Sequence, residues 1–116
     1  MNTTGDFHPL DEIELLEFFG VEPAARAVED GYWCYEITDK RGITLRFSFN
    51  IYERSVQTAL SLGDSLISTV SHEMADRMVI REGELRCEFS ANGEKTTLAV
   101  GTGESLSVTW SSLRTE

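Results

Sequence analysis

Apolar and polar positions follow two different spacings along the chain, a helical spacing before residue 31 and a strand-like spacing after it. After residue 31, apolar and polar residues alternate, which is typical of strands that bury one face. Before residue 31, apolar side chains recur every three or four residues, which is typical of an amphipathic helix. The stripe that this helix would bury consists of Ile13, Leu15, Leu16, Phe18 and Phe19.

The start of the helical part carries a capping pattern. Asp11 can accept a hydrogen bond from the backbone of the first turn, and Glu14 stands three residues later, as in a capping box. The sequence therefore predicts an acidic helical segment over residues 11–29, with a second short helical turn that begins at Pro23. Residues 1–10 lack this periodicity and are predicted to form a flexible arm.

Residues 31–113 are predicted to form antiparallel β-structure. Seven or eight alternating runs are separated by turn residues about every 8–12 residues, and Asn92-Gly93 is typical of a tight hairpin turn. The predicted fold class is α+β and mainly β, with the N-terminal helix packed on a 7–8-stranded antiparallel meander. Three architectures fit this meander: a bent sheet, a half-barrel or a sandwich. At 116 residues, the chain is predicted to be a single domain.

Acidic residues are concentrated at the start of the chain. The chain carries 10 Lys and Arg against 20 Asp and Glu, a net charge of −10, and residues 1–30 hold eight of the acids but one base. This balance argues against a nucleic acid or an anionic membrane surface as the partner. The acids form either a solvated helix face or a docking surface for a basic protein, where charge of one sign speeds association. The candidate docking residues are Asp11, Glu12, Glu14, Glu17 and Glu22.

Two short motifs invite a catalytic interpretation, and both are incomplete. Residues 63–66 spell Gly-Asp-Ser-Leu, the GDSL signature of an esterase and lipase family in which the serine is the nucleophile, but no Asp-x-x-His follows them. Residues 72–76 resemble the His-Glu-x-x-His zinc helix, but Asp76 stands where the second histidine is needed. Both are interpreted as chance matches. The sequence therefore predicts no catalytic residue, no metal site and no cofactor, in a protein that is not an enzyme.

The cysteines and the opening residues bear on the cellular compartment. Cys34 and Cys87 form no Cys-x-x-Cys motif, and two free buried thiols are favoured over a disulfide that would close a long loop. The opening residues lack the basic and apolar regions of a secretory signal. We therefore expect a cytoplasmic protein.

Aromatic residues are clustered where the β-structure begins. Tyr32, Trp33 and Tyr35 occupy neighbouring and alternate positions, so both faces of this strand carry aromatic area. Either the strand is buried on both sides, or one face belongs to an interface or a ligand pocket.

Two hypotheses about function follow. The first is a non-catalytic, acidic protein-binding module, and more specifically an inhibitor that neutralises a basic partner, as bacterial immunity proteins do for nuclease toxins. Its support is the small size, the acidity and the lack of a catalytic motif. The alternative is a small-ligand-binding or dimeric β-sandwich accessory protein, motivated by the two-faced aromatic strand and by exposed sheet edges that could pair in a homodimer.

Overall fold

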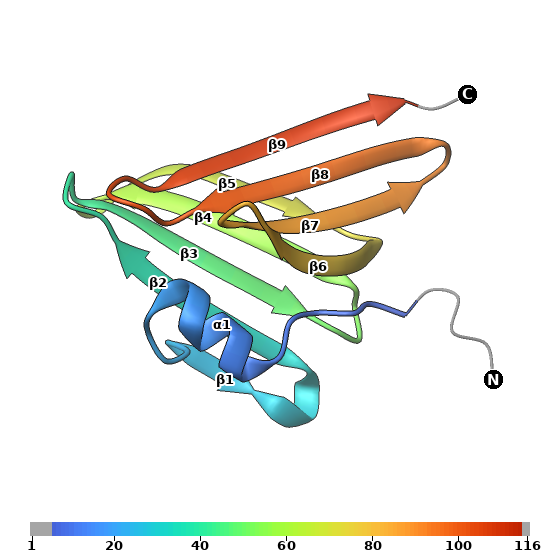
Figure 1. Cartoon of the computed structure of the whole chain (residues 1–116), viewed down its shortest axis with the longest axis horizontal. Coiled ribbons are helices and arrows are strands. Elements are labelled where there is room, and N and C mark those ends of the chain that lie inside the picture. Colours follow the sequence, from blue (N-terminus) through green and yellow to red (C-terminus); the bar gives the residue numbers. More distant parts are fainter. Residues whose placement is uncertain (1–5, 115–116) are drawn as a thin grey trace.

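The computed structural model describes residues 6–114 and contains one α-helix, one short 3₁₀ helix and nine strands in that range (Figure 1). The helices are α1 (Glu12–Phe19) and the 3₁₀ helix η1 (Val28–Asp30). The strands are β1 (Ala25–Ala27), β2 (Tyr32–Thr38), β3 (Ile43–Asn50), β4 (Ser55–Leu62), β5 (Ser65–His72), β6 (Ala75–Arg81), β7 (Glu84–Ala91), β8 (Glu94–Gly101) and β9 (Ser107–Arg114).

The strands form two antiparallel sheets, and within each sheet every strand pairs with its neighbours in sequence. One sheet has the order β1-β2-β3-β4-β5 and the other has the order β6-β7-β8-β9. The predicted class, α+β and mainly β with an antiparallel meander, is confirmed, and of the three architectures the chain adopts two separate sheets with no closed barrel. The structure has nine strands where the sequence predicts seven or eight, because the three-residue strand β1 has no alternating pattern in the sequence.

The four-stranded sheet and α1 cover the same face of the five-stranded sheet (Figure 1). Phe19 of α1 stacks on Tyr35 of β2, with ring centroids 5.1 Å apart, and lies 5.5 Å from the ring of Phe47 on β3. Phe89 of β7 and Leu98 of β8 close the same core from the second sheet. The helix and the second sheet therefore share one hydrophobic core with β2, β3 and β4.

The helix buries a narrower stripe than its sequence predicts. Leu15 and Phe19, which lie four residues apart on one side of α1, are buried, whereas Ile13 is 69% exposed and Leu16 is 39% exposed. A helix that lies on one sheet face needs only the side chains that project toward that sheet. The prediction was wrong for Ile13 and Leu16, and α1 consequently presents apolar area to solvent.

The second helical turn predicted after Pro23 is absent, and residues 25–27 form the edge strand β1 instead. Ala25 pairs with Cys34 of β2, and the backbone N–H of Ala24 donates to the carbonyl of Cys34 at 2.8 Å. A few alanines cannot nucleate a helix by themselves, while the open edge of β2 offers backbone partners at once. The acidic helical segment predicted for 11–29 therefore ends at Phe19.

The flexible arm predicted for residues 1–10 is also wrong where the structure describes it. Phe7 is buried and makes an edge-to-face contact with Phe49, at 6.2 Å between ring centroids. His8 donates its backbone N–H to Asp76 and accepts from the N–H of Met78 on β6. Burial of one large aromatic side chain and two backbone hydrogen bonds hold this segment against the core. Residues 1–5 of the predicted arm lie outside the described residues.

Asp39, in the turn between β2 and β3, ties the two sheets together. Its carboxylate accepts from the backbone N–H of Leu106, just before β9, at 3.0 Å, and from the side chain of Arg41 at 2.9 Å. Arg41 in turn donates to the carbonyl of Leu106 at 3.0 Å. Burial alone would raise the pKa of Asp39, but the N–H of Leu106, the Arg41 side chain and the N–H of Ile43 together hold it well below its usual range.

Replacing Asp39 by Asn is therefore expected to lower stability at pH 7 and to flatten its dependence on acid. A carboxyl whose pKa is depressed by folding stabilises the native state above its unfolded pKa of about 3.9, and this contribution is lost as the pH falls through the folded pKa. At about pH 7 the urea midpoint of Asp39→Asn should lie below that of the native chain, and at about pH 2.5 this difference should be smaller. Asp64→Asn, in the exposed β4–β5 turn, is the control. An unchanged midpoint at pH 7 would refute the role of this tie.

Candidate protein-docking site

Two of the five candidate docking acids build the start of α1. The backbone N–H of Glu14 donates to the Asp11 carboxylate at 2.8 Å, and the N–H of Asp11 donates to the Glu14 carboxylate at 3.1 Å. This is the capping box that the sequence predicts. Removal of either carboxylate would therefore weaken the helix itself.

A third acid, Glu12, joins the acidic helix to the aromatic strand. Its carboxylate accepts hydrogen bonds from the guanidinium of Arg26 on β1, at 3.0 Å, and from the indole N–H of Trp33 on β2. The hydrogen bond from Trp33, reinforced by Arg26, lowers the pKa of Glu12. Glu12 thus connects α1 to β1 and β2, and its carboxylate is already paired with groups of the same chain.

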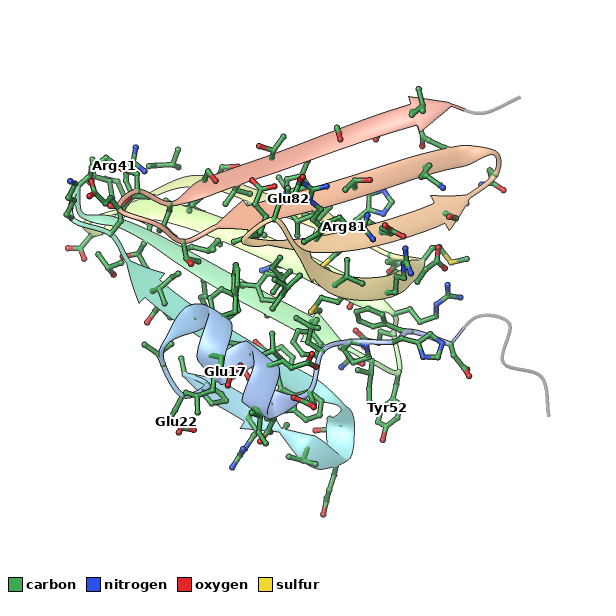
Figure 2. All side chains as sticks on the ribbon, in the orientation of Figure 1. Glu17, Glu22, Arg41, Tyr52, Arg81 and Glu82 are labelled. Carbon is green, nitrogen blue, oxygen red and sulfur yellow. The ribbon has the colours of Figure 1, made fainter. Side chains whose placement is uncertain are left out.

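The remaining two acids, Glu17 and Glu22, are exposed and form no hydrogen bond or ion pair with the residues that the structure describes. Figure 2 locates Glu17 on α1 and Glu22 in the segment that follows it. Ile13 and Leu16 are the exposed apolar side chains of the same helix. We call these four side chains, Ile13, Leu16, Glu17 and Glu22, the α1 surface.

The three candidate aromatic residues have three different environments. Tyr35 is 1% exposed and belongs to the core. Trp33 is half-buried and stacks on Phe49, with ring centroids 5.7 Å apart and planes 15° apart. Tyr32 is also half-buried, and burial and the neighbouring Cys34 thiol raise the pKa of its hydroxyl. Trp33 is therefore the aromatic residue that the fold brings together with a candidate acid, Glu12.

The hydroxyl of Tyr35 is buried and has no hydrogen-bond partner among the residues that the structure describes, and its burial raises the pKa of Tyr35 to about 12. Because an unsatisfied buried hydroxyl destabilises the native state, Tyr35→Phe is expected to raise the free energy of unfolding by about 1 kcal/mol. Tyr52→Phe, whose side chain is 69% exposed, should change it by less than about 0.5 kcal/mol. Urea denaturation measures both variants, and a clear loss of stability in Tyr35→Phe would show that the hydroxyl is bonded.

An apolar groove of about 620 Å³ opens between the start of α1, η1 and the ends of β2 and β3. Glu12 and Arg26 lie at its edge. The sequence does not predict this groove, because its walls come from five separate segments. One signal for the pairing at its edge was present in the sequence: Arg26 is the one lysine or arginine among the eight acids of residues 1–30. Its apolar walls are Leu10, Leu15, Val28, Trp33, Phe49 and Ile51.

The two motifs of catalytic appearance do not assemble into a catalytic pair. Ser65 begins β5 and His72 ends it, paired with Leu62 and Val56 of β4, so about 20 Å of strand separates the two residues. The ring of His72 packs against Phe89 at 4.8 Å and its Nδ1 lies 2.8 Å from the Glu73 carbonyl. Within residues 6–114, no group of three or more His, Cys, Asp or Glu residues could hold a metal ion.

The cysteines are buried and free, as the sequence predicts. Cys34 lies on β2 of the five-stranded sheet and Cys87 on β7 of the other, and burial raises the pKa of the Cys87 thiol. None of the described helices is long and apolar enough to cross a membrane.

Comparison with known proteins gives one informative match. No protein-family model matches the chain, and no curated protein matches it. The fold is similar to a chain in the solved structure of a contact-dependent growth inhibition toxin–immunity protein complex from Klebsiella pneumoniae 342, with a TM-score of 0.82 and 21% sequence identity. The match covers 91% of this chain and 96% of that chain. The two chains share a fold.

Proposed function

We propose that this chain is an immunity-type protein, a non-catalytic module that binds a basic protein toxin and neutralises it. The observation that carries the proposal is the fold shared, over nearly the whole of both chains, with a chain from a toxin–immunity protein complex. The net charge of −10 favours the immunity component of such a pair over the toxin, because an acidic protein complements a basic toxin such as a nuclease.

The α1 surface is the proposed docking site for this partner. Glu17 and Glu22 carry charges that no base among the described residues neutralises, and Ile13 and Leu16 add exposed apolar area beside them. Acidic charge steers a basic protein toward this face, while apolar area supplies affinity once water is excluded. Asp11, Glu12 and Glu14 contribute to the field of this face but act mainly within the fold.

A cytoplasmic location accords with two free buried thiols.

Capture of the partner from the native host tests the proposal. The tagged full-length chain is incubated with host extract at low salt, the bound proteins are identified by mass spectrometry, and the complex is then washed with increasing salt. We expect one basic protein at a 1:1 ratio, released by salt because the association is electrostatic. Recovery of the chain alone, or of an acidic partner that resists salt, would contradict the proposal.

A homodimer is the second candidate, and the β4–β5 hairpin favours it. Leu62, Leu66 and Ile67 are each at least half exposed there, at an edge of the five-stranded sheet. Exposed apolar area beside a free strand edge is a site where two copies can associate. Light scattering distinguishes the two states, because a monomer has a mass of 13.0 kDa.

A further inference from the structure

The apolar groove beneath the start of α1 has walls that the fold holds in place. Ile51 donates its backbone N–H to the Gly31 carbonyl at 2.9 Å, which fixes the end of β3 beside the start of β2. Gly31 itself has a φ of 70°, and a Cβ there would lie 2.7 Å from Cγ1 of Ile51. The groove is therefore a preformed feature of the fold, and its volume of about 620 Å³ is large enough for one large side chain.

Trp33 is fixed in this groove by contacts on two sides. Its ring stacks on Phe49, and its indole N–H donates to Glu12, whose carboxylate is held in turn by Arg26. Because the indole N–H is already paired, the wall that Trp33 offers to an occupant is apolar. Glu12 is likewise paired, so an occupant need not bring a positive charge into the interior of the groove to neutralise it.

Asp11 and Glu12 lie in the lining of the groove, and other acids follow its wall residues in sequence; we call these acids its rim. Asp11 follows the wall residue Leu10, and Glu29 and Asp30 follow the wall residue Val28 in η1. Arg26 is the one lysine or arginine in residues 6–30, and it is paired with Glu12. An occupant that buries an apolar group here therefore gains further if it carries positive charge on either side of that group.

We propose that this groove is an anchor site, which receives one large apolar side chain from a basic segment of the protein partner, with lysine or arginine residues flanking it. The inference rests on the proposed function and adds a second contact region to the α1 surface. Burial of an anchor side chain in a preformed pocket is the usual source of affinity at such interfaces, whereas the surrounding charges set the rate and the choice of partner.

Titration with short peptides, followed by NMR, tests the anchor site on the full-length chain. The probes are a capped pentapeptide with leucine between two pairs of lysines, the same peptide with serine for leucine, and the leucine peptide with glutamates for the lysines. The readout is the indole N–H resonance of Trp33. We expect the lysine–leucine peptide to shift this resonance and to bind about tenfold more tightly than the serine peptide. The glutamate peptide should bind more weakly still.

Two variants of matched exposure locate the binding. Val28 is 55% exposed at the groove wall, and Ile67 is 56% exposed on β5, so Val28→Ser and Ile67→Ser remove similar area without disturbing the core. We expect Val28→Ser to weaken the lysine–leucine peptide about threefold to fivefold and Ile67→Ser to leave it unchanged. Equal binding to both variants, or equal binding of the serine peptide, would overturn the anchor site.

The outcomes also separate this inference from the proposed function. If a basic partner is captured but binds Val28→Ser as well as the native chain, the anchor site is wrong and the immunity-type function stands. If neutral indole binds the groove as tightly as the lysine–leucine peptide does, the charged rim plays no part, the anchor site is overturned, and the groove is a small-ligand pocket.

Discussion

Phe47→Ala is expected to lower the free energy of unfolding by about 3–5 kcal/mol, one of the largest losses that a single truncation in this chain can give. Phe47 lies at the middle of β3, is fully buried, and contacts the rings of Phe19 and Phe49. Its removal leaves a cavity where α1 meets the five-stranded sheet, in addition to the lost burial of the ring. Urea denaturation of the variant measures the loss.

Arg46→Ala is the matched control, because Arg46 is the preceding residue on β3 and faces the other way. Its side chain is 48% exposed, and its guanidinium pairs with Glu36 at 3.4 Å, an interaction worth at most about 1 kcal/mol. A Phe47→Ala variant no less stable than Arg46→Ala would contradict the shared core that joins α1 to the sheets.

Glu17→Ser combined with Glu22→Ser is expected to slow association with the captured partner about threefold to tenfold at low ionic strength and to reduce its salt dependence. These are the two candidate acids that the fold does not use. Changing Asp11, Glu12 or Glu14 would be harder to interpret, because those residues cap α1 or hold Trp33. Surface plasmon resonance between low and high salt separates the association rate from the dissociation rate.

Asp64→Ser combined with Glu94→Ser removes the same amount of charge at two exposed positions outside the α1 surface, the β4–β5 turn and the start of β8. We expect this control pair to leave the association rate within about twofold of the native chain, since screening confines the effect of distant surface charges. If both pairs slow association equally, net charge alone steers the partner and the α1 surface is not the docking site.

The local features of the fold could be predicted because each depends on a few consecutive residues. Asp11 and Glu14 form the capping box that their spacing predicts. Asn92 and Gly93 both adopt positive φ at the turn between β7 and β8, as the tight hairpin requires. The alternation of Leu45, Phe47 and Phe49 places all of them in the core.

The arrangement of these elements could not be read from the same patterns. Alternation shows that Phe47 and Phe89 each face inward, but it does not show that they belong to different sheets that pack on each other. Residues 25–27 have helix-favouring composition, yet the unpaired edge of β2 determines their conformation. The exposure of Ile13 likewise depends on which side of α1 meets the sheet.

The candidate site was predicted in part. The sequence shows that acids are concentrated in residues 1–30. It does not show that Asp11, Glu12 and Glu14 make contacts within the fold, whereas Glu17 and Glu22 do not pair with any described residue. Glu12 and Trp33 are 21 residues apart, and only the pairing of β1 with β2 under α1 brings them together. The groove that they border has walls from segments that share no sequence pattern.

The most direct test of the immunity-type function is growth of a bacterium that expresses the captured basic partner. Expression of the partner alone should stop growth, and co-expression of this chain should restore it, because a bound toxin is neutralised. The Glu17→Ser and Glu22→Ser pair should restore growth less well than the Asp64→Ser and Glu94→Ser pair. A partner that is harmless by itself, or whose toxicity this chain does not reduce, would contradict the account.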